Sequence, residues 1–262
     1  MKALRIVAVN HAAKHPNLVH NDEFARSVGF RGGLVPGVDV YAYLTQPVVE
    51  LWGRAWLMGG DAEVRFVKPV CDGDQLDIEA AIGRSRDLRV VARCGGEERA
   101  ALTARLGPTT EFTEVDDVPE VPPIERRLRP LRESFHEGQG LGSLSVVLSD
   151  SDCVAQLGEV AERVSLYRRE RIVHPAHLLR LADNIFSANV DLPPWLHVGS
   201  SLTHLGLVHW NESISVRARV MATFARSGHE FIQLDVLMVG PDGRPRLRVM
   251  PYTAIYKPSF VA

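Results

Sequence analysis

Apolar and polar residues alternate along several stretches of the chain, which is the pattern of strands with one buried face. Four such strands are predicted in the first part of the chain, near residues 63–67, 75–82, 88–94 and 99–106. Before them, a helix starting at residue 38 is predicted by apolar residues at helical spacing, namely Tyr41, Leu44, Val48 and Leu51. We expect this helix to be buried and to bend at Pro47.

The second part of the chain repeats this order of elements. Helical spacing predicts a helix over residues 176–188. Alternation then predicts four more strands, near residues 202–208, 213–224, 231–239 and 246–256. A long helix followed by a meander of antiparallel strands suits a sheet that wraps around the helix. The sequence therefore predicts an α+β fold in which two such units cover each other.

The two parts match each other at one fixed offset along the chain, which we call the repeat offset. The apolar pair Leu34-Val35 recurs at this offset as Ile172-Val173, in both cases just before the predicted helix. The alternating apolar residues at 76–82 recur at the same offset at 214–220. One match between strands is weak evidence, but one offset that holds across a helix and a distant strand indicates an internal duplication.

The segment between the two parts has a composition of its own. It carries several acidic residues and five prolines, namely Pro108, Pro119, Pro122, Pro123 and Pro130. Proline fixes its backbone angle and lacks an N–H donor, so this composition favours an extended connector. We expect an N-terminal half at 1–107, a linker at 108–140 and a C-terminal half at 141–262.

Charge and cysteine content exclude several classes of protein. With 30 basic and 32 acidic residues the net charge is −2, so there is no positive field to attract nucleic acid. Three cysteines without a close pair argue against a disulfide framework. The sequence shows neither the apolar core of a signal peptide nor an apolar run long enough for a bilayer. We expect a cytoplasmic protein with no membrane partner.

Two stretches of the sequence contain motifs. Residues 17–37 read NLVHNDEFARSVGFRGGLVPG, and residues 64–74 read VRFVKPVCDGD. The first is similar to D-x-N-P-L-H-x-D followed by I-V-H-G at the start of a helix, and the second to F-x-x-P-V-x-x-G-D. The sequence thus resembles the MaoC-like hydratase and dehydratase group. That resemblance implies a double hot-dog fold, with two antiparallel sheets that each wrap a central helix and pair as a pseudo-dimer.

The same resemblance implies a substrate and a reaction. The substrate is an acyl thioester of coenzyme A or of an acyl carrier protein, and the reaction is the reversible addition of water to an enoyl thioester. His20 and Asn17 stand at catalytic positions of the motif, and the backbone N–H of Gly37 polarises the thioester oxygen at the helix N-terminus. Gly33 is a second candidate for close approach of a ligand. We expect no cofactor and no metal.

Two positions depart from the family pattern. His15 stands where the family has its catalytic aspartate, and Pro36 stands where it has a histidine before the helix glycine. A histidine pair can still move protons near neutral pH, so His15 is kept as a catalytic candidate and Pro36 as a ligand contact. The departures leave two alternatives to the hydratase open. One is a catalytically impaired subunit that binds acyl thioesters or has a structural role, and the other is an acyl-CoA thioesterase.

The second half offers two histidines at the entrance of its predicted helix. His174 aligns with Pro36 through the repeat, and His177 lies one turn further along the same face. No third ligand stands at a useful spacing, so ligand contact or packing is favoured over metal binding. We expect His174 to reach the site from the second half. Two hot dogs in one chain already satisfy the need for pairing, and a homodimer of such chains remains possible.

Overall fold

The computed structural model describes residues 4–83, 85–107, 118–251 and 254–257. Its first half contains, in chain order, β1 (Leu4–Val7), the 3-10 turn η1 (Leu18–His20), α1 (Asp22–Ser27), α2 (Gly37–Trp52), α3 (Arg54–Gly59), β2 (Asp61–Phe66), β3 (Gln75–Ile82), β4 (Leu88–Cys94) and β5 (Glu97–Arg105). The long helix and the strands after it follow the order that the apolar pattern predicts. The pattern did not predict β1 or α3.

The second half begins with the 3-10 turn η3 (Arg132–Ser134). It continues with β6 (Gly140–Val147), α4 (Asp150–Glu159), α5 (Leu166–Glu170), α6 (Pro175–Asn189), β7 (Leu196–His197), β8 (Gly199–His204), β9 (Ser213–Arg226), β10 (His229–Val239), β11 (Pro245–Pro251) and β12 (Ala254–Lys257). The predicted strand at 246–256 is thus assigned as two separate strands, β11 and β12. Among the described residues, no helix combines the length and the apolar character that a bilayer crossing requires.

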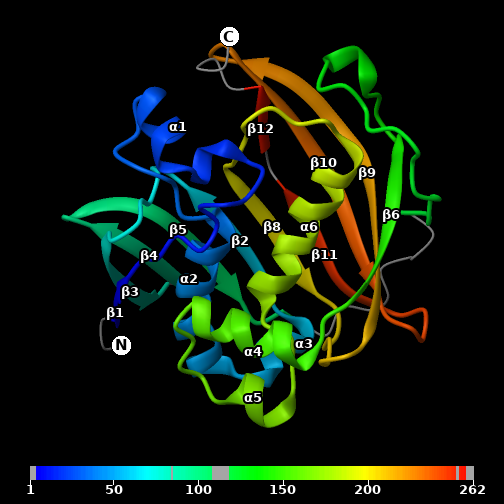
Figure 1. The fold of residues 1–262 in the computed structure, drawn as a ribbon. Helices are drawn as coiled ribbons and strands as arrows, with labels where there is room; N and C mark the ends of the chain where they lie inside the picture. The colour runs from blue at the N-terminus through cyan, green and yellow to red at the C-terminus, as the bar shows by residue number, and fades with distance from the viewer. Residues whose placement is uncertain (1–3, 84, 108–117, 252–253, 258–262) are drawn as a thin grey trace.

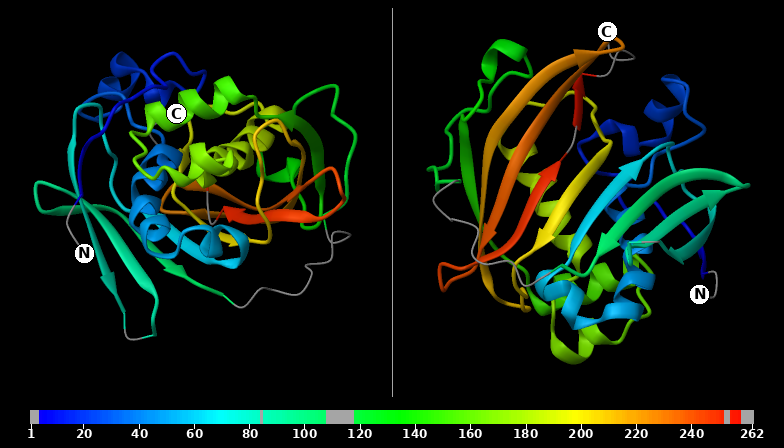
Figure 2. Two further views of the ribbon diagram at one scale, coloured as in Figure 1. Left: turned by 90° about the horizontal axis from the view of Figure 1, so that it is seen from below. Right: turned by 180° about the vertical axis from the view of Figure 1, so that it is seen from behind.

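The described strands form one curved antiparallel sheet. Their order is β1-β3-β4-β5-β2-β8-β11-β10-β9-β6, with β12 also paired to β10 and β7 paired to β12. Helices α2 and α6 pack against each other on the concave face of this sheet, as Figures 1 and 2 show. Each half therefore wraps its sheet around one central helix.

The two halves join through the pairing of β2 with β8, at the centre of the sheet. Glu63 pairs with Ser201, which is its own counterpart at the repeat offset. On either side of this pair, Ala62 pairs with Leu202 and Val64 pairs with Ser200, so the register reads the same from both halves. A pseudo-two-fold axis therefore passes through the sheet between Glu63 and Ser201, and it relates the two halves.

Helix α2 is buried over most of its length because it packs against helix α6 and against the strands of its own half. Every residue from Val38 to Val49 is buried, and Pro47 lies within this run. Leu51 was expected on the buried face, but its side chain is 41% exposed because it lies in the last turn, beyond the buried run. Most buried apolar residues of both halves belong to one continuous core, and two small clusters, around Val19 and around Val118, lie apart from it.

The proline-rich segment expected as a linker lies partly outside the described residues, since residues 108–117 are not described. The part from residue 118 onward packs along the second half. Val118 is buried against Leu237, and the N–H of Val121 donates to Ser143 Oγ at 3.0 Å. This part of the segment is anchored to the sheet of the second half and forms no strand or long helix of its own.

Candidate functional site

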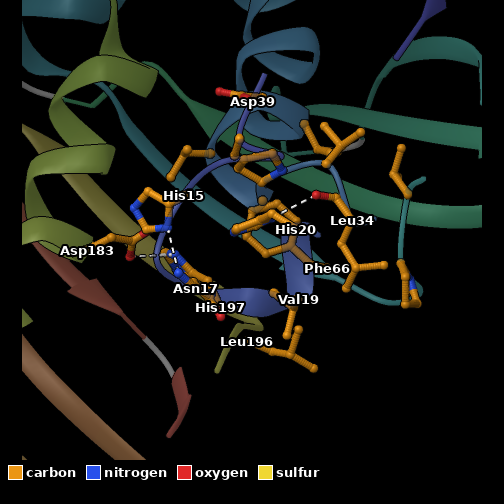
Figure 3. Close-up of a pocket in the computed structure, with 18 of the residues that line it drawn as sticks. His15, Asn17, Val19, His20, Leu34, Asp39, Phe66, Asp183, Leu196 and His197 are labelled. Carbon is orange, nitrogen blue, oxygen red and sulfur yellow. Dashed lines mark hydrogen bonds and ion pairs between the residues drawn. The ribbon is translucent and has the colours of Figure 1, made fainter. Parts of the chain in front are cut away.

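A cavity of about 600 Å³ lies where the two halves meet (Figure 3). The first half contributes the loop from His11 to His20, the start of α2 and the end of β2. The second half contributes one face of α6 and the segment at 195–198. The motif of the first half is therefore completed by residues that lie far away in the sequence.

The walls of this cavity differ in polarity. Around the start of α2 the wall is apolar, with Val35, Phe66 and Leu196 among its residues. The opposite wall is a polar stripe on α6, made of Arg180, Asp183, Asn184 and Ser187. These side chains share one helix face because each follows the one before it by about one turn or by one position. The cavity thus offers an apolar surface and charged groups side by side.

The N-terminus of α2 opens into the cavity at Gly37. The first N–H groups of a helix have no acceptor within the helix, and they carry the positive end of its dipole. A Cβ on Gly37 would lie 3.0 Å from the ring of Phe66, so a larger residue at this position would require that ring to shift. Pro36, the N-cap residue, also lines the cavity. This geometry suits the stabilisation of negative charge on a carbonyl oxygen.

His20 is placed to accept a proton. Its Nδ1 lies 2.7 Å from the carbonyl oxygen of Leu34. Because a carbonyl only accepts, Nδ1 carries the proton, and Nε2 of the neutral ring keeps its lone pair. Burial lowers the pKa of His20, although the Leu34 hydrogen bond acts in the opposite direction. The ring is therefore a neutral base near pH 7, at the wall of the cavity.

His15 lies beside His20 but has the opposite hydrogen-bonding role. The two ring centroids are 5.7 Å apart, with the rings nearly perpendicular at 79°. Nδ1 of His15 accepts from the backbone N–H of Asn17 at 3.1 Å, so in the neutral ring Nε2 carries the proton. Burial also lowers the pKa of His15. This pair thus provides one donor and one acceptor, and no carboxylate.

Asn17 links the two halves. Its Nδ2 donates to the carbonyl oxygen of Trp195 at 2.9 Å, and its Oδ1 accepts from the N–H of Trp195 at 3.2 Å. Both polar atoms of this buried side chain are therefore used on the backbone of one residue. Asn17 lines the cavity, but its side chain is bonded to the backbone of the cavity wall.

Asp183 and His197 both line the cavity, although neither belongs to a motif of the sequence. His197 Nδ1 lies 2.9 Å from Asp183 Oδ1, and its Nε2 lies 2.7 Å from Ser200 Oγ. Burial disfavours the charged ring, but the Asp183 carboxylate outweighs it, and the pKa of His197 is raised. The two residues form a largely buried ion pair at the cavity wall. The polar stripe on an otherwise apolar helix was the signal that could have revealed Asp183.

A second ion pair joins the two central helices. Arg180 Nη2 of α6 donates to Asp39 Oδ1 of α2 at 2.5 Å, and Arg180 Nη1 lies 3.8 Å from Glu159 Oε2. Asp39 is buried, and this burial raises its pKa although Arg180 acts against the shift. All three side chains line the cavity, so the pair also fixes the spacing of its two walls.

Three residues expected at the site are placed elsewhere. Gly33 is not among the residues that line the cavity, and a Cβ there would lie 2.3 Å from the carbonyl oxygen of His20, so this glycine allows two loops to approach. His174 and His177 do not line the cavity either. His174 does not reach across the halves, because its Nε2 lies 3.0 Å from Glu162 Oε2 inside the second half.

The second half contains the counterpart of the cavity in collapsed form. Its volume is about 10 Å³, room for about one water molecule. Every residue around it is related by the repeat offset to a residue that lines the large cavity. These residues are Leu57, Ile172, Val173, Pro175, Leu178, His204, Gly206, Leu207 and Val208. The duplication therefore produced two equivalent positions, and only one of them has the volume to hold a ligand.

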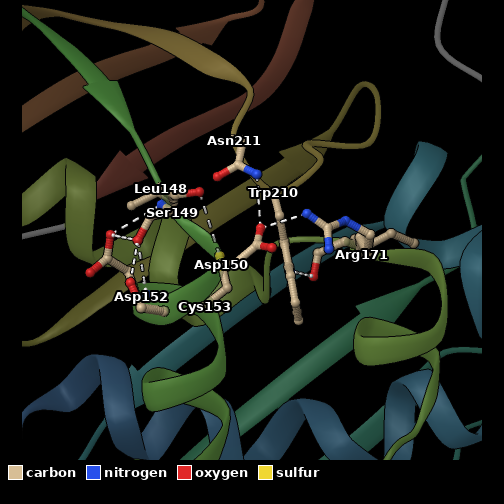
Figure 4. Close-up of polar contacts among 10 residues, drawn as sticks. Leu148, Ser149, Asp150, Asp152, Cys153, Arg171, Trp210 and Asn211 are labelled. Carbon is tan, nitrogen blue, oxygen red and sulfur yellow. Dashed lines mark hydrogen bonds and ion pairs between the residues drawn. The ribbon is translucent and has the colours of Figure 1, made fainter.

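A polar cluster joins the start of α4 to the loops before α6 and β9 (Figure 4). Asp150, the first residue of α4, accepts from Arg171 at 2.5 Å and from Asn211 Nδ2 at 2.8 Å. The guanidinium of Arg171 also lies over the ring of Trp210, 5.3 Å from its centroid. Ser149 and Asp152 form a capping box at the same helix end. These contacts hold α4 at the position that corresponds, through the repeat offset, to the motif loop of the first half.

The class of fold can now be stated: the chain has the double hot-dog fold. Sequence comparison finds no match to a protein-family model or to a curated protein. A solved structure from Chloroflexus aurantiacus, described as a MaoC domain protein dehydratase, is similar at 12% identity and a TM-score of 0.63, covering 98% of this chain and 95% of that one.

Among the described residues, no group of three or more His, Cys, Asp or Glu side chains is placed to hold a metal ion.

Two further solved structures show the same architecture. A conserved protein of Mycobacterium tuberculosis with a double hotdog fold is 13% identical at a TM-score of 0.63, covering 98% of this chain and 96% of that one. A protein from Lactobacillus plantarum described as an oleoyl thioesterase is 12% identical at a TM-score of 0.54, covering 98% and 96%. These identities establish the shared fold, and the reaction has to be argued from the site.

Proposed function

We propose that the protein binds an acyl thioester in the cavity and catalyses the reversible addition of water to its conjugated double bond. One observation carries the proposal: the unprotonated Nε2 of His20 and the N-terminus of α2 at Gly37 belong to the same cavity. A base for the water and a donor for the thioester oxygen are the two groups that this reaction needs. The apolar wall around Phe66 receives the acyl chain.

In the proposed reaction the thioester oxygen accepts a hydrogen bond from the backbone N–H of Gly37. His20 Nε2 removes a proton from a water molecule, and the oxygen of that water bonds to C3 of the enoyl group. The electron pair of the double bond moves to the thioester oxygen, where the helix N-terminus stabilises the negative charge. The protonated His20 then returns its proton to C2. Water is added in full, and the enzyme regains its initial state.

The rim of the cavity supports a carrier with negative charge. Lys68 and Arg99 line the cavity, and their only close acidic partner among the described residues is Glu97, at 3.1 Å and 3.4 Å. Two cations against one anion leave a positive excess at this edge. Both coenzyme A and an acyl carrier protein present a phosphate at the end of the pantetheine arm, which this edge suits. We therefore propose that the thioester carrier leaves the cavity between Lys68 and Arg99.

The experiment uses the purified full chain with a panel of thioesters of increasing acyl length. Enoyl-CoA, 3-hydroxyacyl-CoA and saturated acyl-CoA esters are each incubated with the protein, and both the enoyl absorbance and free thiol are followed. Hydration that is lost in His20→Ala supports the proposal. Release of thiol identifies a thioesterase instead, and binding without turnover identifies a thioester-binding subunit.

A further inference from the structure

The motif of the first half lacks a carboxylate at the place where the proposed reaction needs one. A water molecule has two hydrogens, so a base that takes one leaves the other to be held by a second acceptor. His15 stands at that place, but its Nδ1 is already occupied by the N–H of Asn17, which leaves an N–H donor at Nε2. A donor cannot hold a hydrogen of the attacking water. Another acceptor must therefore face His20.

Asp183 meets this requirement from the other half of the chain. It lines the same cavity from α6, and its side chain is 19% exposed. In Figure 3 it lies directly beside His15, whose ring is 5.7 Å from that of His20. Its negative charge acts on both histidines, since it favours the protonated form of each. Oδ1 is engaged with His197, and Oδ2 has no hydrogen-bond partner among the described residues.

The other two carboxylates of the cavity are less suitable. Asp39 is buried, with Oδ1 bound to Arg180 at 2.5 Å. Glu159 lies near the same guanidinium, 3.8 Å away. In Figure 3 Asp39 lies well apart from His15, next to which Asp183 lies, and the charge of Asp183 favours the protonated form of His20. Asp183 is therefore the carboxylate that the structure couples to the proposed base.

We infer that Asp183 holds the attacking water against His20, and that His197 positions Asp183; this inference rests on the proposed function. One hydrogen of the water is directed at His20 Nε2 and the other at Asp183 Oδ2, so an oxygen lone pair points at C3. When His20 takes its proton, the Asp183 carboxylate stabilises the imidazolium that forms. His20 alone carries the proton to C2. The catalytic site is thus assembled from both halves of the duplicated chain.

His197 acts as a positioning residue. Nδ1 of its ring lies against Asp183, and Nε2 lies 2.7 Å from Ser200 Oγ and 3.1 Å from the carbonyl oxygen of Gly199. Both nitrogens are therefore occupied, so the ring has no free nitrogen for the substrate. Its contact with Phe66, at 5.5 Å between ring centroids, fixes the plane of the ring. Asp183 is held from one side only, with its second oxygen left for the water.

The test compares four full-length variants on the enoyl-CoA that the wild type hydrates best. We expect Asp183→Asn to lower kcat by about 100-fold or more with little change in KM, as for loss of a group that acts on proton transfer. Adding His15→Asp to Asp183→Asn should raise kcat to at least a tenth of the wild-type value, because a carboxylate then stands at position 15, beside His20. Asp191→Asn, at an exposed carboxylate just beyond the end of α6 and outside the cavity, is the matched control and changes kcat by less than threefold.

A structural role for the ion pair predicts a different result. In that case the double variant Asp183→Asn with His197→Gln, which removes both charges, regains activity together with thermal stability, and the inference is overturned. It is equally overturned if Asp183→Asn keeps kcat within threefold of the wild type while hydration is observed.

A second measurement separates this inference from the proposed function. NMR titration of His20 in the wild type and in Asp183→Asn reports their coupling without any turnover, and we expect the pKa of His20 to fall in the variant. If the wild type hydrates no thioester but the pKa of His20 falls, the proposed function fails and the pairing of Asp183 with His20 stands. An unchanged pKa of His20 overturns the pairing.

Discussion

The N-termini of α2 and α6 occupy equivalent positions in the two halves, yet only α2 opens into a cavity large enough for a ligand. At the first helical residue, Gly37 in one half corresponds to Pro175 in the other, and proline has no N–H to donate. The next free donor of α6, the N–H of Ala176, is taken by Nδ1 of His174 at 3.1 Å. The second half has thus lost the donor that the first half presents.

The aromatic residues that line the two cavities differ as well. Phe66 of the first half corresponds to His204 of the second, which is buried and packs edge-on against Trp56 at 4.5 Å between ring centroids. In the second half α4, held by the Asp150 cluster, stands where the first half has its motif loop. Closing a duplicated site therefore needs few changes: one lost donor, one filled cap and one helix in place of a loop. The fold of that half is retained.

The largest expected effect tests which half carries the reaction. His20→Ala removes the proposed base and should lower kcat for hydration by about 10² to 10⁴-fold. His177→Gln, in the second half and outside the cavity, should change kcat by less than threefold. Steady-state kinetics on the same enoyl-CoA measure both variants. Equal losses in the two variants would contradict the assignment of the reaction to the first half.

The next effect concerns the link between the halves. Asn17→Ala leaves the buried N–H and carbonyl of Trp195 without their partners, which should lower the free energy of unfolding by about 2–4 kcal/mol. Urea denaturation measures this change. If Asn17 acts in catalysis instead, as the motif implies, kcat falls sharply while the free energy of unfolding stays near that of the wild type.

A smaller effect is expected at the helix N-terminus. Gly37→Ala places a Cβ at 3.0 Å from Phe66, so the ring shifts and the donor is misplaced. We expect kcat/KM to fall about 10- to 100-fold, comparable with the loss of one oxyanion donor. Combining it with Phe66→Leu should restore part of the loss. Gly158→Ala in α4 is the control, because a Cβ there meets nothing within 4 Å and leaves kcat/KM unchanged.

The smallest effect concerns pH and the closed site. Burial lowers the pKa of His204 from 6.5 to about 3. The folded state therefore keeps this ring neutral where the unfolded state binds a proton, so the stability contributed above pH 6.5 is lost as pH falls from 6.5 towards 3. The loss amounts to at most about 1.4 kcal/mol for each pH unit.

His204→Phe, which copies Phe66, removes this dependence and leaves no unpaired ring nitrogen. Thermal unfolding at pH 7 and pH 4.5 should show a smaller difference for this variant than for the wild type. His209→Gln, at an exposed position, should leave the difference as it is. An identical difference in the wild type and His204→Phe would show that the acid sensitivity arises elsewhere.

The fold was largely predictable because it depends on patterns that are local in the sequence. Alternation located the strands, and the repeat that relates Leu34 to Ile172 indicated two equivalent units that pair. The short elements α3 and α4 were missed because they carry no extended apolar pattern. The exposure of Leu51 could not be foreseen either, because helical spacing shows which face of a helix is apolar but not where the neighbouring sheet ends.

The site was predictable only in its local part. The motif located His20 and Gly37, which both line the cavity. Asp183 belongs to the other half of the chain, far from His20 in the sequence, so only the packing of α6 against α2 brings the two into one cavity. The opposite error was made for His174, which looked like a site residue because it aligns with Pro36. Its ring is instead directed to Glu162 by the fold around it.

The pairing of β2 with β8 has a consequence for how such a molecule can change. In a symmetric assembly of two identical subunits, any replacement appears on both sides of the axis, so neither active site can be lost without losing the other. Here the axis runs through a single chain, between Glu63 and Ser201. Each side can therefore accumulate its own replacements, and in this chain one side keeps a cavity of about 600 Å³ where the other keeps about 10 Å³.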